Sequence, residues 1–393
     1  MTYTDGRVIH DADSHTMETG DWLAPYLDPD LLDSLGALYG GAETGQRILK
    51  VIETAKERKS DPEKDAAARE NIISGEKGWG GYGAFDTEER VRALDWLGFG
   101  SQLVFPTFGL ALVRRAKDED TLYKASHALN QAQAAFCKAD PRLVFVAFVP
   151  LDNPERAMDL LEKALDDGAG AVLVPANAPA GERSPGHTVY DAFWRRLQEA
   201  NIPFTLHIGP GTMSQPVAYH NNGRERAPDL HGGGENIRFG DYPCLGYAPQ
   251  MFLTAMVYDG VFERFPKLRG AVVECGAGWV PEFLRQLDGG YRSFKRTDPY
   301  LQGMELLPSE YIRRAVKFTP FPSEDVGRMI NDAGAELFMF SSDYPHPEGT
   351  KDPLGKFDAS LEAVDDASKD AFFRRNYEEL LDMAPQPQAV AAE

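Results

Sequence analysis

The sequence predicts an α/β fold, a TIM-type (β/α)8 barrel, on three observations. Eight short runs rich in β-branched and aromatic residues alternate with amphipathic segments along the 393 residues. Most of these runs are continuously apolar, as expected of strands that are buried on both faces of a parallel sheet. No early strand is followed directly by a Gly-x-Gly-x-x-Gly turn, which counts against a doubly wound open sheet, the second choice.

Helical patterns separate the eight expected strands. In chain order the strand runs are RVIHDADS near residue 10, SQLVFPTF from Ser101, LVFVAFVPL from Leu143, GAVLVPAN from Gly170, PFTLHIG from Pro203, LRGAVVECG from Leu268, VKFTPF from Val316 and ELFMFSSD from Glu336. Asp86 with Glu89 forms a capping-box-like start for the helix DTEERVRALDWLG. Asn153 followed by Pro154 starts NPERAMDLLEKALDDG, which Gly168 ends.

Two segments are longer than the connections that a minimal barrel needs. Residues 21–85 are long, charged and partly helical, and we interpret them as an insertion after the first strand with a solvated charged face. Residues 209–250 form a long loop after the fifth strand, which predicts a lid or pocket wall over the carboxyl ends of the strands. We therefore expect one barrel domain over residues 1–383 and a loose tail over residues 384–393.

Composition favours a small-molecule partner. The formal net charge of -20 opposes binding to nucleic acid or to anionic lipid. The three cysteines form no Cys-x-x-Cys pair, which indicates a reducing compartment. The chain starts without a basic region leading into an apolar stretch, and no window approaches the roughly 18 apolar residues of a membrane span. A cytoplasmic location without a membrane anchor is the expectation.

Polar residues gather at the end of the first strand. Asp11, Asp13 and His15 alternate along the run, and alternate residues of a strand share one face. We therefore expect Asp13 and His15 to project together into the mouth of the barrel, with Asp11 one layer below.

Three more strands end in polar side chains: His207 ends the fifth, Glu274 the sixth and Asp343 the eighth. Each has an ordinary explanation, since a histidine can be a satisfied core residue and an aspartate can cap a turn. Glu274 lies in an apolar strand, however, and a buried carboxylate needs a partner. Because a barrel brings all strand ends into one ring, these residues together predict a site for a divalent cation such as zinc, manganese or iron(II).

The segments DADSH, TLHIG, ECGAGWVPEFLRQLD and SSDYPH together resemble the amidohydrolase superfamily, in its amidohydrolase-related branch of hydrolases and nonoxidative decarboxylases. The resemblance extends from the first strand to the last helix. It implies that Asp13 and His15 take the place of the first-strand metal-binding pair and that His207 and Asp343 are metal ligands. It also implies a homodimer and a proton-transferring role for Asp343.

This sequence departs from the family pattern at three positions. Asp13 stands where a histidine is commoner, and Glu274 stands where many relatives have a strand-six histidine. The fourth strand, AVLVPAN, offers no lysine that could be carboxylated to bridge two metals. One metal ion is the simpler expectation. A second ion held through Glu274, with help from His220, His231 or His346, is the open alternative.

Residues near the strand ends are candidates for the substrate pocket, and Trp79, Phe105 and Phe108 suggest a sizeable apolar or aromatic substrate. The pocket candidates are His220, His231, Trp279, Tyr344 and His346. Arg224 and Arg226 in the long loop could neutralise an acidic group of the substrate, or be plainly solvated.

Three hypotheses for function follow. The first is hydrolysis or nonoxidative decarboxylation, in which a metal ion polarises a carbonyl or carboxylate and lowers the pKa of a bound water toward about 7. Asp343 or Glu274 then transfers the proton, and His207 is the third catalytic candidate. The second is a non-haem iron oxygenase, with one or two irons, because carboxylates outnumber imidazoles. The third is a noncatalytic small-molecule binder, which the cluster of ionisable residues disfavours.

Overall fold

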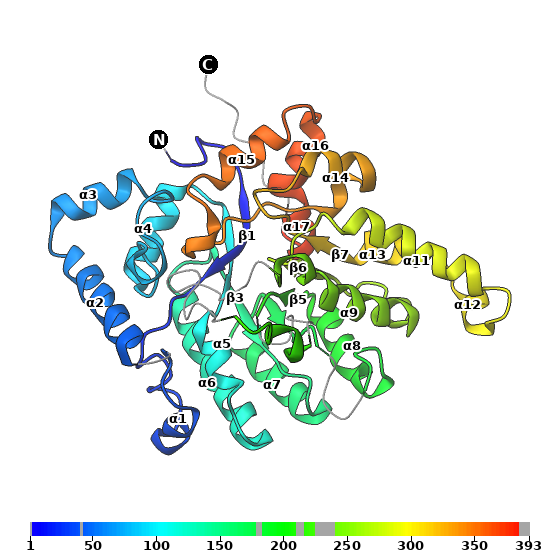
Figure 1. Cartoon of the computed structure of the whole chain (residues 1–393), viewed down its shortest axis with the longest axis horizontal. Coiled ribbons are helices and arrows are strands. Elements are labelled where there is room, and N and C mark those ends of the chain that lie inside the picture. Colours follow the sequence, from blue (N-terminus) through cyan, green and yellow to red (C-terminus); the bar gives the residue numbers. More distant parts are fainter. Residues whose placement is uncertain (1, 40–41, 178–182, 210–215, 225–239, 385–393) are drawn as a thin grey trace.

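The computed structural model describes residues 2–39, 42–177, 183–209, 216–224 and 240–384. Seven parallel strands form one sheet in which neighbours in sequence are neighbours in space, and helices surround it (Figure 1). The strands are β1 (His10–His15), β2 (Ser101–Phe105), β3 (Leu143–Phe148), β4 (Ala171–Leu173), β5 (Phe204–His207), β6 (Gly270–Val273) and β7 (Val316–Phe318). This sequential parallel order confirms the predicted TIM-type barrel.

The predicted eighth strand is an extended segment without regular strand structure. Residues 338–344, called here the closing segment, bridge to β7 through Phe338 and to β1 through Tyr344. On the β1 side, Asp343 donates its backbone N–H to the carbonyl of Asp13 at 2.9 Å. The N–H of Phe340 instead bonds the carbonyl of Phe372, outside the sheet, which interrupts the ladder. The closing segment thus joins the last strand to the first and completes the ring.

Helices and short helical turns occupy the connections. Between β1 and β2 lie α1 (Pro29–Leu35), α2 (Ala42–Arg58), α3 (Pro62–Glu70), η1 (Gly78–Gly80) and α4 (Thr87–Leu97). The next connections contain α5 (Phe108–Val113), α6 (Glu119–Cys137), α7 (Pro154–Asp166), η2 (Thr188–Tyr190) and α8 (Asp191–Ala200). After β5 come η3 (Val217–His220), η4 (Tyr242–Cys244), α9 (Tyr247–Tyr258) and α10 (Val261–Arg264). The remaining elements are α11 (Val280–Phe294), α12 (Pro299–Gly303), α13 (Pro308–Ala315), α14 (Val326–Ala333), η5 (Ala335–Leu337), η6 (Pro347–Gly349), α15 (Pro353–Ser360), α16 (Asp366–Asp370), the π-helical turn η7 (Ala371–Arg375) and α17 (Asn376–Leu381).

The predicted helix starts are confirmed. The Asp86 side chain accepts a hydrogen bond from the backbone N–H of Glu89 at the start of α4. The Asn153 side chain accepts from the N–H groups of Glu155 and Arg156 at the start of α7. These caps satisfy donors that have no partner inside the helix.

A β-bulge in β1 turns Asp11 away from Asp13 and His15. Asp11 of β1 pairs with Gln102 of β2, whereas Ser14 pairs with Val104. Between these two pairs, β1 contains one residue more than β2, which is a β-bulge. The prediction that residues 11, 13 and 15 share one face is therefore wrong. It assumed unbroken alternation, and one extra residue in β1 reverses the face of every residue that follows.

The helices before β2 lie on one flank of the barrel, opposite α11 and α12 (Figure 1). They are tied to the turn that follows the closing segment, because Gly78 in η1 donates its N–H to the carbonyl of Pro345 at 2.7 Å. A buried ion pair of 2.7 Å between Arg58 and Glu89 holds α2 against α4. This flank thereby supports the turn that follows Asp343.

The long loop after β5 is described only in part. Its described residues include η3, η4 and the start of α9, whereas 210–215 and 225–239 lie outside the described residues. Its predicted role as a lid stays a prediction. Within the part of the chain that the structure covers, no helix is both long and apolar enough to cross a bilayer.

Apolar strand residues pack in separate clusters on the two sides of the sheet. One contains residues from several strands and the closing segment, among them Leu103, Val146, Ala171, Val273 and Met339. The residues next to these along the chain point to the opposite side and pack in other clusters. The largest cluster contains Val172, Leu206, Val272, Phe318 and Phe340. This division is what a barrel requires, since alternate side chains point to the interior and to the surrounding helices.

Replacing Phe340 by alanine should lower the free energy of unfolding by about 3–5 kcal/mol. Its fully buried ring packs against Phe99, Phe357 and Phe373 and holds the closing segment against the helices. Denaturant titration followed by circular dichroism measures the change. The matched control is Phe294→Ala, whose side chain is 63% exposed, and it should change stability by about 0.5 kcal/mol or less. Equal losses in both variants would contradict the packing role of Phe340.

Candidate metal centre

Six buried side chains converge at the carboxyl ends of the strands. They come from β1, from the end of β5, from the residue after β6, and from the closing segment and the turn that follows it. We call them the histidine-carboxylate cluster: Asp13, His15, His207, Glu274, Asp343 and His346. In two overlapping groups of four, all the potential ligand atoms lie within 4.8 Å of one another. The structure thus brings together all five predicted metal ligands and His346, which the sequence offered as a pocket residue and as a possible ligand of a second ion.

The cluster atoms face one another at close range. The Nε2 atom of His207 lies 3.2 Å from Oδ1 of Asp13 and 3.7 Å from Oε2 of Glu274. The Nε2 atom of His15 lies 3.2 Å from the same Asp13 oxygen and 3.7 Å from Oδ1 of Asp343. Imidazole nitrogens and carboxylate oxygens therefore point to a common centre.

Backbone contact fixes the orientation of His207. Its Nδ1 lies 2.8 Å from the carbonyl oxygen of Ile208. A carbonyl oxygen only accepts, so Nδ1 carries the hydrogen and Nε2 presents its lone pair to the carboxylates. This arrangement is typical of histidines that bind metals.

One hydroxyl orients both remaining histidines. Thr107 donates its hydroxyl hydrogen to the carbonyl of Thr16 at 2.7 Å, and its lone pairs face Nδ1 of His15 at 3.2 Å and Nε2 of His346 at 2.9 Å. Both ring nitrogens must then be donors. His15 consequently turns Nε2 toward the centre, and His346 turns Nδ1 toward Asp343, at 3.0 Å from its Oδ1.

Two of the carboxylates sit on left-handed backbone. The φ angles are 53° at Glu274 and 54° at Asp343, a region that residues other than glycine seldom adopt. Hydrogen bonds hold both: Glu274 donates its N–H to the hydroxyl of Thr319, and Asp343 donates to the carbonyl of Asp13, each at 2.9 Å. Strained residues of this kind concentrate at functional sites.

Burial and close partners set the charge states. Burial raises the pKa of Asp343 to about 6, although the neighbouring His346 opposes the rise. Burial, and after it the charge of His346, lower the pKa of His15 to about 3. For Asp13, burial would raise the pKa, but His207 and His15 outweigh it and bring the pKa below its ordinary value. At neutral pH, His15 is thus neutral and Asp13 ionised, the forms that bind metal.

The residues present fit a divalent cation. Among the described residues, the buried Nε2 of His15 and Oδ1 of Asp343 have no hydrogen-bond partner. Buried polar atoms in this state are uncommon and call for an explanation such as an ion. Imidazoles with carboxylates are the donors that zinc, manganese and iron(II) accept. A cation at the centre would satisfy both atoms.

Asp11 supports the cluster from the other face of β1. Its carboxylate accepts from Nε2 of Gln102 at 2.7 Å and from the N–H and hydroxyl of Ser342 at 2.8 and 2.6 Å. Burial raises its pKa to about 7, and these hydrogen bonds oppose the rise. Because Ser342 precedes Asp343, Asp11 ties the closing segment to β1 beside the cluster.

Cations lie behind the cluster. The buried guanidinium of Arg90 donates to the carbonyl of His15 at 2.5 Å and lies 5.3 Å from the ring centroid of Tyr344. Nζ of Lys77 lies 5.5 Å from the same ring, and burial lowers the pKa of Lys77 to about 8. The Tyr344 hydroxyl donates to the carbonyl of Tyr82 at 2.6 Å. Tyr344 is therefore packed in a buried layer, and its role as a pocket residue stays a prediction.

The other pocket candidates differ in their surroundings, and some lie outside the described residues. Trp279 donates to the carbonyls of Cys275 and Gly276, and its ring packs on Phe283 and Phe318. The Phe105 ring contacts the His207 ring, with centroids 4.5 Å apart, and the Trp79 ring stacks on Phe108 at 4.9 Å. Arg224 is exposed, and the side chain of His220 is not described. His231 and Arg226 lie outside the described residues.

Sequence reasoning missed Thr107 and Arg90. Thr107 lies at the end of the second predicted strand run, so the rule that identified His207 also applied to it. Arg90 is an interior residue of α4, where an arginine is usually solvated, and no sequence signal marks it as buried.

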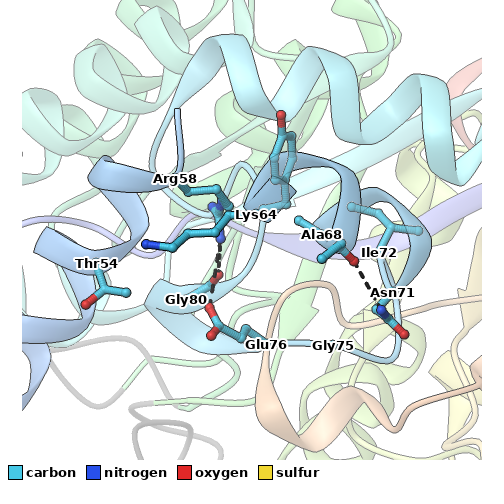
Figure 2. A pocket seen from close by; sticks show the side chains of 11 residues that line it. Thr54, Arg58, Lys64, Ala68, Asn71, Ile72, Gly75, Glu76 and Gly80 are labelled. Atoms are coloured by element: carbon cyan, nitrogen blue, oxygen red, sulfur yellow. Dashed lines mark hydrogen bonds and ion pairs between the residues drawn. The ribbon is translucent and has the colours of Figure 1, made fainter. Parts of the chain in front are cut away.

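A separate cavity of about 390 Å³ lies among α2, α3 and residues 71–82 (Figure 2). In Figure 2 the Arg58 guanidinium points toward the carbonyl of Gly80 at 2.8 Å and the carboxylate of Glu76 at 3.9 Å. Arg58 also binds Glu89 at 2.7 Å, so its charge is already compensated. None of the residues that line this cavity belongs to the histidine-carboxylate cluster. The cluster is therefore the better candidate for chemistry.

Known proteins share this fold. An amidohydrolase from Mycobacterium avium subsp. paratuberculosis K-10 is 22% identical, with a TM-score of 0.72 over 95% of this chain and 99% of that one. A 2,6-dihydroxybenzoate decarboxylase in complex with 2,6-dihydroxybenzoate is 16% identical, with a TM-score of 0.62 over 98% of this chain and 100% of that one.

A third similar structure is the 5-carboxyvanillate decarboxylase of Novosphingobium aromaticivorans DSM 12444 in complex with manganese and 4-hydroxy-3-methoxy-5-nitrobenzoic acid. It is 18% identical, with a TM-score of 0.62 over 96% of each chain. At such identities these likenesses show a common fold. The family model described as amidohydrolase matches residues 79–383, more than half of the chain. The chain therefore belongs to the amidohydrolase family.

Proposed function

We propose that this protein is a metal-dependent enzyme that decarboxylates, without oxidation, a sizeable aromatic carboxylate, with hydrolysis of an aromatic acyl compound as the alternative reaction. The observation that carries the proposal is the histidine-carboxylate cluster at the mouth of an amidohydrolase barrel. Two similar structures are decarboxylases of aromatic carboxylates, and one of them contains manganese. These relatives support decarboxylation and favour manganese over zinc or iron.

In this proposal, the five predicted ligands hold the metal ion. The ligand atoms of Asp13, His15, His207 and Glu274 lie within 4.8 Å of one another, and Asp343 approaches them from the side of His15. When bound, the ion polarises a substrate carboxylate or carbonyl and lowers the pKa of a water toward about 7. Thr107 and the carbonyl of Ile208 keep the imidazoles in the tautomers that leave Nε2 of His15 and His207 toward the centre.

Decarboxylation breaks the bond between the ring carbon and the carboxylate, releases carbon dioxide and leaves the electron pair on the ring carbon. A proton must then be delivered to that carbon. We assign this proton to Asp343, because its carboxyl lies in the cluster next to His15 and His346. Glu274 is the second candidate. In hydrolysis the same groups would instead take a proton from water.

The oxygenase hypothesis gains no support from the similar structures described above, which are an amidohydrolase and two decarboxylases. The homodimer and the cytoplasmic location remain predictions from the sequence.

Removing the metal should abolish turnover. The protein is treated with a chelator, dialysed, and reloaded with manganese, zinc or iron(II). Release of carbon dioxide is then measured with hydroxylated and methoxylated benzoates. Hydrolysis is measured with aryl amides and esters. We expect equal amounts of carbon dioxide and the decarboxylated arene from manganese-loaded protein and none from the chelated form. Hydrolysis alone would overturn decarboxylation, and activity that survives metal removal would overturn the metal-dependent mechanism.

Replacing Asp343 by asparagine should lower turnover by about 10²–10⁴-fold, the usual contribution of a positioned acid or base. Asparagine tolerates the left-handed backbone at this position, so the fold should persist. Metal content should also fall, because an amide is a weaker ligand than a carboxylate. The control is Asp33→Asn, an exposed residue of α1, which should retain both properties. Normal turnover with full metal content in the Asp343 variant would refute its assigned role.

A further inference from the structure

We propose that the cavity among α2, α3 and residues 71–82 is a binding site for a small neutral aromatic alcohol, such as a phenol. None of the described residues that line this cavity belongs to the histidine-carboxylate cluster. The site is therefore separate from the metal centre, and its existence does not depend on which reaction the cluster catalyses.

Helix α3 lacks a buried face. None of its residues, all of which the structure describes, is buried, and only Ala68 among them packs against an apolar cluster. Most helices in proteins depend on such packing for their stability. Polar contacts hold α3 instead, since the Asp65 carboxylate accepts a hydrogen bond of 2.6 Å from the Tyr82 hydroxyl and lies 3.5 Å from Arg92. A molecule in the cavity would add apolar contact to the side of α3 that carries Ala67 and Ala68.

The size and lining of the cavity suit a small aromatic molecule. Its volume of about 390 Å³ lies within the usual range of ligand pockets, about 300–1,000 Å³. Apolar side chains of Ala67, Ala68 and Ile72 line it together with Tyr82. Figure 2 shows Ala68 and Ile72 on one side of the cavity and Arg58 above it. A flat ring fits between such surfaces, because it gains apolar contact on both faces.

One polar gap in the cavity fits a hydroxyl group. Nη1 of Arg58 and Oε2 of Glu76 point toward one another but lie 3.9 Å apart, which is too far for a hydrogen bond (Figure 2). Polar groups separated by such a distance are commonly bridged by a third group. A hydroxyl can accept from the guanidinium and donate to the carboxylate at the same time. The ligand should therefore place a hydroxyl between Arg58 and Glu76.

The charges around the cavity favour a neutral ligand over an anion. Arg58 is already paired with Glu89 through hydrogen bonds of 3.2 and 2.7 Å, and Nζ of Lys64 lies 3.8 Å from the Asp61 carboxylate. Glu76 adds a further negative charge at the rim, where 72% of its side chain is exposed. A carboxylate in the cavity would lie beside Glu76 without a positive charge left to balance it.

The cavity wall is continuous with the support of the metal centre. Arg58 donates to the carbonyl of Gly80 at 2.8 Å, and Gly78 in the same short turn donates to the carbonyl of Pro345 at 2.7 Å. A ligand held between α3 and residues 71–82 contacts both segments at once. Binding should therefore slow the local opening of both.

The test compares neutral 2-naphthol with 2-naphthoate, which has the same ring system and a negative charge. Backbone hydrogen exchange of the full-length protein is measured with each compound. We expect 2-naphthol to slow exchange in residues 62–82 about tenfold at ten times its Kd, because ligand binding stabilises the closed state by mass action. We expect 2-naphthoate to leave exchange in this segment unchanged. No protection by 2-naphthol overturns the site, and equal protection by both compounds overturns the preference for a neutral ligand.

Variants locate the effect. Ala68→Trp places a ring inside the cavity and should abolish the protection, whereas Ala66→Trp changes an exposed residue of α3 that does not line the cavity and should retain it. Glu76→Ala, which leaves α3 unaltered, should weaken 2-naphthol binding about 2–10-fold through loss of one hydrogen bond. Circular dichroism verifies that each variant is folded. Protection that persists in folded Ala68→Trp, or unchanged affinity in Glu76→Ala, overturns the assignment. Each of these failures leaves the proposed function standing, because the metal-reloading experiment reports on the cluster alone.

Discussion

Closure of the barrel is the constraint on which the site depends. The closing segment has to lie beside β1, and the bond from the N–H of Asp343 to the carbonyl of Asp13 sets that register. This one contact places two carboxylates, separated by most of the chain, on the same side of the ring. Asp11 reinforces it from the opposite face by accepting two hydrogen bonds from Ser342. Without closure, Asp13 and His15 of β1 would not have the carboxylate of Asp343 beside them.

Electrostatics explains why the site suits cations. Asp13, Glu274 and Asp343 concentrate negative charge where water is excluded, and such charges need partners. The buried cations Arg90 and Lys77 lie behind the cluster and offset part of this charge, but they do not occupy its centre. The imidazoles complete a donor set for a hard or borderline metal. The same burial that makes the carboxylates unfavourable alone strengthens their interaction with an ion.

The fold leaves the reaction open, because amidohydrolase barrels carry different chemistry on similar scaffolds. Glu274 after β6 and His346 after the closing segment complete the histidine-carboxylate cluster. Both are oriented from behind, Glu274 by Thr319 through its backbone and His346 by Thr107 through its ring.

The sequence by itself determined the barrel and five members of the cluster, Asp13, His15, His207, Glu274 and Asp343, because parallel strands in a ring bring their carboxyl ends together whatever their separation in the chain. Tertiary structure alone decided the rest. The bulge reversed the face of Asp11, the eighth strand lost its regular ladder to a bond with Phe372, and Thr107 came to orient two histidines. Such features arise from contacts between distant segments, and the alternation of residues along a single strand cannot encode them.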